Sequence, residues 1–203
     1  MKSIFPEKLL HYVDGHKSSD PNPTPNTMES NGIVPDIIDV APDNFLEVVY
    51  DDELKVDSGN VLTPRQVKNA PVVTWRTNPN QLYTLLMTDP DAPSRDAPTN
   101  REVRHWLIVN ITENNVRNGQ VLVEYRGSGP PKDTGLHRYV FLLFPQKKYI
   151  ESIMFIPSYD RGSRMKTSTR KLIKEFDLMN PVAGNFFQAQ YEESVDPPPE
   201  YPK

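Results

Sequence analysis

Three stretches of the sequence carry the polar side chains that could form a site. The first, TDPDAPSRDAPTN (88–100), follows an apolar run with two carboxylates. The second, HWLIVNI (105–111), begins an apolar segment with a histidine. In the third, GSGPPKDTGLHRY (127–139), a loop rich in glycine and proline runs into a histidine and a tyrosine. Histidines and unhindered backbone N–H groups favour negative charge, so the chemistry indicated is a small-anion site.

The two carboxylates, Asp89 and Asp91, are separated by one proline. Residues two apart point to the same side of extended backbone, so we expect these side chains to project together at the end of a sheet. There they would accept hydrogen bonds from an ammonium group or a protonated phosphate.

The glycine-rich loop supplies backbone donors. Gly127 and Gly129 have no side chain, so their N–H groups can approach a ligand closely, and the two prolines that follow stiffen the loop. If residues 137–144 form a strand, His137 and Tyr139 lie on one face of it with Phe141 and Leu143, and the alternate residues lie on the other. A site here would be shaped before the ligand arrives.

Each of these features also has a purely structural interpretation. A histidine in an apolar strand is more often a core residue whose hydrogen bonds are satisfied than a ligand group. Asp-Pro-Asp is more often a turn capped by its own side chains, and glycines before a strand are more often turn residues. The sequence alone does not bring the three stretches together.

Several enzyme classes lack their motifs. The chain has no cysteine, no G-x-S-x-G nucleophile elbow and no phosphate-binding loop with a Lys-Ser/Thr pair. One alternative that stays open is a metal site on Asp89, His105 and His137, or an acid–base or metal-assisted hydrolase that uses Asp89 and His105. We expect no enzyme activity and no cofactor.

Six segments rich in β-branched and aromatic residues predict strands that would position these groups. They are FLEVVY (45–50), VVTW (72–75), LYTLLMT (82–88), RHWLIVNI (104–111), VLVEY (121–125) and HRYVFLLF (137–144). Turn-forming proline, asparagine and glycine residues separate them, which is typical of a mainly β protein.

One helix is predicted in TSTRKLIKEFDLMNP, residues 167–181. Leu172, Ile173, Phe176 and Met179 share one helical face and are interpreted as core. Thr167 or Ser168 would cap its start, and Asn180-Pro181 would end it.

Composition and charge limit the kinds of partner that we expect for the chain. The formal net charge of −4 does not suit nucleic acid, and no apolar run approaches the length of a membrane span. The first residues lack the apolar centre of a secretory signal, so we expect a cytoplasmic monomer. Residues 1–27, polar and rich in proline, are predicted to be a disordered extension; residues 28–194 form the domain and 195–203 a proline-rich tail.

The quoted motifs resemble the phosphatidylethanolamine-binding protein family, to which the Raf kinase inhibitor protein belongs. The resemblance rests on DPDAPS (89–94), HWLIVN (105–110), GSGPPKDTGLHRYVFLLF (127–144) and PVAGNFFQAQY (181–191), and it spans about residues 33–194. It implies a central antiparallel sheet packed on a smaller one with a few peripheral helices. It also implies a site at one end of the sheet that takes phosphate-like anions, including the phosphoethanolamine headgroup.

Carried over by motif, the resemblance implies nine ligand-binding residues. They are Asp89, Asp91, Pro93, His105, Gly127, Gly129, Pro131, His137 and Tyr139. Val103 departs from the family, which commonly has an aromatic residue two positions before the site histidine, and the C-terminus lacks the helix of the mammalian members.

The leading hypothesis is a non-enzymatic protein that binds phosphorylated headgroups or side chains, modulates signalling through partners and touches membranes only peripherally. The alternative is an inhibitor of a kinase or a serine protease that acts through its surface, with the anion site as a regulatory switch. Substitution of Pro93 should then disturb partner binding.

Overall fold

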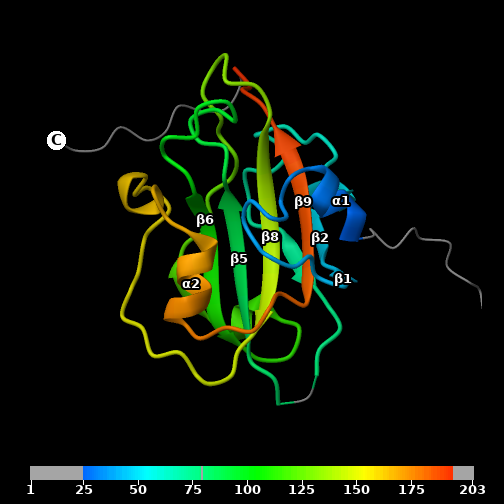
Figure 1. Cartoon of the computed structure of the whole chain (residues 1–203), viewed down its shortest axis with the longest axis vertical. Helices are drawn as coiled ribbons and strands as arrows, with labels where there is room; N and C mark the ends of the chain where they lie inside the picture. The colour runs from blue at the N-terminus through cyan, green and yellow to red at the C-terminus, as the bar shows by residue number, and fades with distance from the viewer. Residues whose placement is uncertain (1–24, 79, 194–203) are drawn as a thin grey trace, which may run out of the picture.

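A six-stranded sheet forms the centre of the protein in the computed structural model, which describes residues 25–78 and 80–193 (Figure 1). Only β1 and β9 run parallel to each other; every other neighbouring pair is antiparallel. In spatial order the strands are β1 (Asn44–Phe45), β9 (Ala183–Ala189), β8 (His137–Pro145), β5 (Tyr83–Asp89), β6 (Val103–Ile111) and β7 (Gln120–Val123).

A smaller antiparallel sheet packs against one face of the central one. Its order is β3 (Leu54–Lys55), β2 (Glu47–Tyr50) and β4 (Val72–Thr74). The helices are α1 (Pro25–Ser30) and α2 (Thr169–Glu175), with short 3₁₀ turns at Asp51–Glu53, Val116–Asn118 and Gly162–Arg164. The predicted architecture, mainly β with two sheets and few helices, is confirmed.

Strand β8 separates two hydrophobic cores. Tyr139, Phe141 and Leu143 pack into the core shared with the small sheet. The other core contains side chains of both helices, and the alternate residues of β8, Val140, Leu142 and Phe144, pack into it. This alternation is the one predicted for residues 137–144, and it follows from the two-residue period of a strand.

Helix α2 is shorter than predicted. Ser168 caps its start, accepting a hydrogen bond from the backbone N–H of Lys171, but the helix ends at Glu175. Asp177 then adopts a φ of 49°, and residue 178 forms a bridge with Gln146. The predicted core position of Met179 is therefore wrong: it lies beyond the helix and is 47% exposed.

Strands β3 and β9 were not predicted, and the predicted strand 45–50 is divided between the two sheets, with Phe45 in β1 and residues 47–50 in β2. β1 and β3 are two residues long, and AGNFFQA (β9) contains a glycine and an asparagine that weaken the strand pattern. Asn185 is nevertheless buried in β9, because its amide donates to the backbone carbonyls of Leu46 and Val56. Of the predicted termini, residues 1–24 and 195–203 lie outside the described residues, and residues 25–27 belong to α1.

The arrangement brings three strand ends together. β5 ends at Asp89, which pairs with Val103 at the start of β6. β8 begins at His137, beside β5 (Figure 1). Within the described ranges, no helix has the length and hydrophobicity needed to cross a bilayer.

Candidate functional site

Asp89 and His137 form a buried pair across β5 and β8. The Nδ1 atom of His137 lies 2.9 Å from Oδ2 of Asp89, and both side chains are at most 5% exposed. On the other side of the ring, Nε2 lies 3.1 Å from the hydroxyl oxygen of Thr134. That hydroxyl donates its proton to the carbonyl of Pro131, so its oxygen is left to accept from Nε2. Both ring nitrogens of His137 are therefore occupied within the protein.

His105 is held differently. Its Nδ1 lies 2.7 Å from the carbonyl oxygen of Arg126, which can only accept, so this nitrogen carries a proton. Its Nε2 has no hydrogen-bond partner within residues 25–78 and 80–193. Burial lowers the pKa of His105 below its ordinary value, and the charges of Arg164 and Arg126 add to this, against an opposing effect of Asp89. His105 is thus a neutral ring with one nitrogen available to a ligand.

Tyr139 contacts His105 and Gly129. Its ring stacks on Phe187 with centroids 5.0 Å apart, and the edge contact with His105 has centroids 5.1 Å apart. The backbone N–H of Gly129 donates to its hydroxyl, and burial, with the charge of Asp89, raises its pKa well above the ordinary value. The phenol therefore keeps its proton and can donate it. We call Asp89, His105, Gly129, His137 and Tyr139 the histidine cluster.

The glycines of the loop have different surroundings. A Cβ atom on Gly127 would lie 2.5 Å from the carbonyl oxygen of Val67, whereas one on Gly129 would meet nothing within 4 Å. Gly127 therefore serves close backbone packing, and Gly129 borders open space beside the histidine cluster. Between them, the hydroxyl of Ser128 is buried and has no partner in the described chain.

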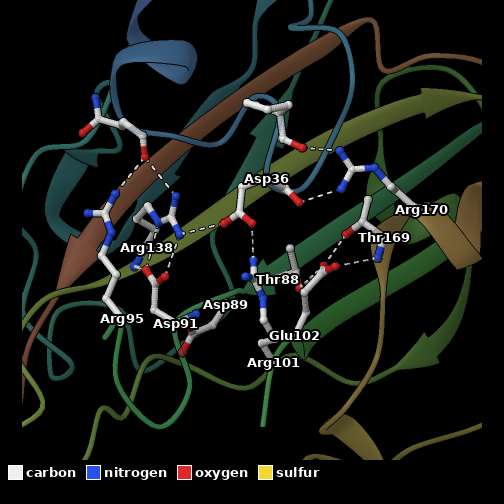
Figure 2. Close-up of polar contacts among 12 residues, drawn as sticks. Asp36, Thr88, Asp89, Asp91, Arg95, Arg101, Glu102, Arg138, Thr169 and Arg170 are labelled. Atoms are coloured by element: carbon white, nitrogen blue, oxygen red, sulfur yellow. Dashed lines mark hydrogen bonds and ion pairs between the residues drawn. The ribbon is translucent and has the colours of Figure 1, made fainter. Parts of the chain in front are cut away.

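Asp91 does not join Asp89, contrary to the prediction. Asp91 pairs with Arg138, with distances of 2.6 Å to Nη2 and 2.9 Å to Nε, and also accepts from the Arg138 backbone N–H (Figure 2). The chain bends after β5, and the backbone N–H of Asp91 donates to Oδ1 of Asp89 at 2.7 Å. Because His137 and Arg138 lie on opposite faces of β8, the two carboxylates are drawn to opposite faces as well.

Arg138 belongs to a network that fixes the segments around the sheet end (Figure 2). Its guanidinium also contacts Asp36 at 3.1 Å, and Asp36 contacts Arg101 at 2.7 Å. The adjacent Glu102 is buried and accepts hydrogen bonds from the backbone N–H and hydroxyl of Thr169, the first residue of α2. This network ties the loop before β6, the segment around Asp36 and α2 to the sheet.

The remaining predicted residues lie at the margins. Pro131 is exposed and contributes its carbonyl to Thr134. Pro93 is partly exposed, follows a cis peptide bond and lies in the loop after β5. The structure thus places five of the nine predicted residues in two contact groups and assigns Asp91 to a structural pair with Arg138. One group is Asp89 with His137, and the other is His105 with Tyr139 and Gly129.

Sequence reasoning missed the cationic groups near His105. Arg164 is fully buried and donates to the carbonyls of residues 104, 105, 157 and 160, and Arg126 supplies the carbonyl that holds the ring. Arg164 lies about 60 residues from His105 in the sequence, so no local pattern indicates their proximity. The positive charges of both arginines act on His105 and lower its pKa.

A metal site was the open alternative for Asp89, His105 and His137. Among the described side chains, no three His, Asp or Glu residues are arranged to hold a metal ion. Nδ1 and Nε2 of His137 are both engaged with protein oxygens. His137 therefore has no ring nitrogen available to a metal ion.

Fold and cluster together define a two-sheet β protein with buried imidazoles and backbone donors at one sheet end. Residues 52–194 match the family model described as phosphatidylethanolamine-binding protein. The chain therefore belongs to the phosphatidylethanolamine-binding protein family.

Relatives carry varied names. The Drosophila melanogaster protein named "Putative odorant-binding protein A5" is 34% identical over 83% of this chain and 80% of its own length. The "26 kDa secreted antigen" of Toxocara canis is 39% identical over 79% of this chain and 62% of its own. A solved carboxypeptidase Y inhibitor, complexed with its cognate proteinase, has a TM-score of 0.72 and 29% identity, covering 86% of this chain and 98% of the inhibitor.

These names concern binding and inhibition rather than catalysis, which agrees with the expectation of a non-enzymatic protein at that coarse level. They do not support a single compartment, because one relative is called secreted. The cytoplasmic location stays a prediction.

Proposed function

We propose that this protein binds phosphate-like anions, such as a phosphoethanolamine headgroup, at the histidine cluster and acts without catalysis. The observation that carries the proposal is the available Nε2 of His105, held in place through Nδ1 by the Arg126 carbonyl. Gly129, whose backbone N–H donates to the hydroxyl of Tyr139, borders open space. Membership of the family supports the ligand class.

Protonation would turn His105 into an anion partner. In the neutral ring, Nε2 is an acceptor and can receive a hydrogen bond from an ammonium group or a protonated phosphate. When Nε2 binds a proton, it can donate to a phosphate oxygen. The arginines nearby oppose that proton in the free protein, and the negative charge of a bound phosphate would offset them.

Other donors would complete the site. The Tyr139 hydroxyl accepts from Gly129 and so has its own proton to donate. The buried Ser128 hydroxyl is a second donor that lacks a partner in the described residues. Asp89 would repel a phosphate, but its carboxylate is engaged within the protein by Nδ1 of His137 and the backbone N–H of Asp91. Asp89 and His137 are assigned a positioning role.

Calorimetric titration of phosphoethanolamine and of inorganic phosphate, at about pH 6 and pH 7.5, tests this proposal. Wild type should bind saturably and with higher affinity at the lower pH. In His105→Gln, the affinity should not increase as the pH is lowered. Comparing the two proteins removes the titration of the ligand's own phosphate, since it is common to both. Wild type that binds neither ligand at either pH would contradict the proposal.

A matched pair of tyrosines provides the control. Tyr139→Phe removes the hydroxyl beside Gly129, whereas Tyr125→Phe removes a buried hydroxyl that contacts Tyr50 and the Val67 carbonyl. Only the first should weaken anion binding, by about tenfold for one lost hydrogen bond. Equal weakening would indicate a general effect on the core.

A second candidate function, proteinase inhibition, is favoured by the structural similarity to the carboxypeptidase Y inhibitor. The test is a titration of carboxypeptidase Y activity with the full chain. Dose-dependent inhibition that reaches completion near one equivalent would support this function. Full proteinase activity at a large molar excess of the chain would contradict it.

A further inference from the structure

His105 occupies a β-bulge near the start of β6. Met87 and Thr88 are neighbours in β5, but their partners in β6 are Trp106 and Arg104. His105 is therefore skipped in this register, and an extra residue on one strand of an antiparallel pair is what defines a bulge. A bulge can turn a side chain away from the alternation of a regular strand.

The bulge decides which face of the sheet His105 occupies. Trp106 packs into the core shared with the small sheet, and Leu107 packs into the core shared with the helices. Strict alternation would place His105 on the face of Leu107. Its ring instead contacts Tyr139, which belongs to the same core as Trp106. The bulge thus puts two successive side chains on one face and turns His105 toward the proposed anion site.

The guanidinium of Arg164 bridges two successive carbonyls at this bulge. Its Nη1 donates to the carbonyl oxygen of Arg104 at 3.3 Å and to that of His105 at 3.1 Å. In a regular strand, successive carbonyls point to opposite sides, so they could not both meet one nitrogen. The double contact is therefore specific to the bulged backbone.

The other donors of Arg164 anchor the guanidinium. Nε donates to the carbonyl of Asp160 and Nη2 to the carbonyl of Pro157, both at 2.8 Å. Because the guanidinium is planar and its donors have fixed directions, these two contacts set the position of Nη1. The side chain is fully buried, so water does not compete for the carbonyls.

The backbone around Arg164 is also tied to the start of β6. Arg164 ends the short 3₁₀ turn Gly162–Arg164. Thr167, which follows this turn, exchanges two backbone hydrogen bonds with Glu102, each 3.0 Å long. Since Glu102 lies directly before β6, the turn that carries Arg164 is held next to the bulge.

The carbonyl that Arg164 holds belongs to the same backbone that orients the His105 ring. The backbone N–H of Arg126 donates to the His105 carbonyl at 3.0 Å, and the Arg126 carbonyl accepts from Nδ1. The His105 carbonyl thus receives one hydrogen bond from Arg126 and one from Arg164. A shift of this carbonyl would disturb the contact that leaves Nε2 available.

We propose that Arg164 is a positioning residue of the anion site, because its guanidinium holds the bulge that turns His105 toward the ligand. This inference rests on the proposed function, which assigns the ligand-facing role to His105. The structural alternative is that Arg164 only ties residues 157–160 to the sheet. In that case, its loss would lower stability without changing the His105 ring.

NMR of the full chain without phosphate, at about pH 7.5, tests the proposal. In wild type, the ring nitrogen shifts of His105 should report a proton on Nδ1, and a nuclear Overhauser contact should connect its ring to that of Tyr139. Arg164→Met has no donor for the two bulge carbonyls. In this variant the contact between the rings should be lost, and the ring should no longer be restricted to the Nδ1–H tautomer.

Asn185→Ala provides a matched control. The buried Asn185 amide also donates to two backbone carbonyls, but it lies in β9 opposite Phe141 and outside the histidine cluster. Its loss should destabilise the protein and leave the tautomer and ring contact of His105 unchanged. A folded Arg164→Met that keeps both ring signals, or an Asn185→Ala that loses them equally, would overturn the proposal.

A measurement on wild type covers the case in which Arg164→Met does not fold. The Nη1 protons of Arg164 should exchange with solvent much more slowly than those of Arg161, which is exposed three residues earlier. Exchange at the same rate would mean that Arg164 does not hold the bulge carbonyls.

Titration with inorganic phosphate separates this inference from the proposed function. At about pH 6, wild type and Asn185→Ala should bind equally, and Arg164→Met should bind at least about tenfold more weakly, as for one lost hydrogen bond. Unchanged affinity in a folded Arg164→Met would overturn the positioning role. If wild type binds no phosphate, the proposed function fails, and the ring signals still decide whether Arg164 holds the bulge.

Discussion

Nδ1 of His137 lies 2.9 Å from Oδ2 of Asp89, and this contact joins the end of β5 to the start of β8. Because Nε2 of the same ring faces Thr134, His137 has no nitrogen to offer a ligand. His105, by contrast, uses only Nδ1. The two histidines that look equivalent in the sequence therefore have different roles: one positions the strand ends and the other faces the site.

The stability of the protein should depend on pH through His105. Its folded pKa is lowered, mainly by burial, so the unfolded chain binds more protons between that pKa and the ordinary value near 6.5. The contribution is complete above about pH 6.5 and is lost as the pH falls toward the folded pKa. Urea unfolding at about pH 7.5 and pH 5.5 should show a smaller loss of stability in His105→Gln than in wild type. An equal loss of unfolding free energy in the two proteins would contradict the lowered pKa of His105 as the cause.

The buried pair of Asp91 and Arg138 should matter more than an exposed pair of similar geometry. Asp91→Asn removes the buried carboxylate and leaves Arg138 only the less buried Asp36, and we expect a loss of about 3 kcal/mol in unfolding free energy. Asp177→Asn breaks the exposed contact with Lys147, also 2.6 Å long, and should cost much less, because water screens an exposed ion pair. Chemical denaturation of both variants provides the comparison, and similar costs would refute the structural role of Asp91.

The two loop glycines should separate stability from binding. Gly127→Ala would bring a Cβ atom to 2.5 Å from the Val67 carbonyl and should destabilise the protein by about 1–3 kcal/mol. Gly129→Ala meets no atom within 4 Å, so stability should change by less than about 0.5 kcal/mol. Its methyl group would instead enter the proposed site and weaken anion binding. Calorimetry that finds Gly129→Ala unchanged in affinity would place the ligand elsewhere.

Much of the fold could be predicted because strand periodicity is a local signal. The alternation in residues 137–144 assigned Tyr139 and Val140 to opposite cores correctly. The signal failed where tertiary contacts decide: Asn185 is tolerated in β9 because distant carbonyls satisfy its amide. The end of α2 was misplaced for the same reason, since a bridge to Gln146 pulls the chain out of the helix.

The site was predictable in its residue types but not in its connections. Spacing suggested that Asp89 and Asp91 act together, and this holds only while the backbone stays extended. The bend after β5 sends Asp91 to Arg138 instead. The proximity of Arg164 to His105 depends on the path of a long connection that no local pattern specifies.

The central claim is that His105 faces the ligand while His137 holds the strand ends, and ring NMR signals test it most directly. Titration with millimolar phosphoethanolamine at about pH 6 should shift the His105 signals saturably and raise the pKa of His105, because the bound phosphate favours the protonated ring. His105 signals that stay unmoved throughout the titration would contradict the account.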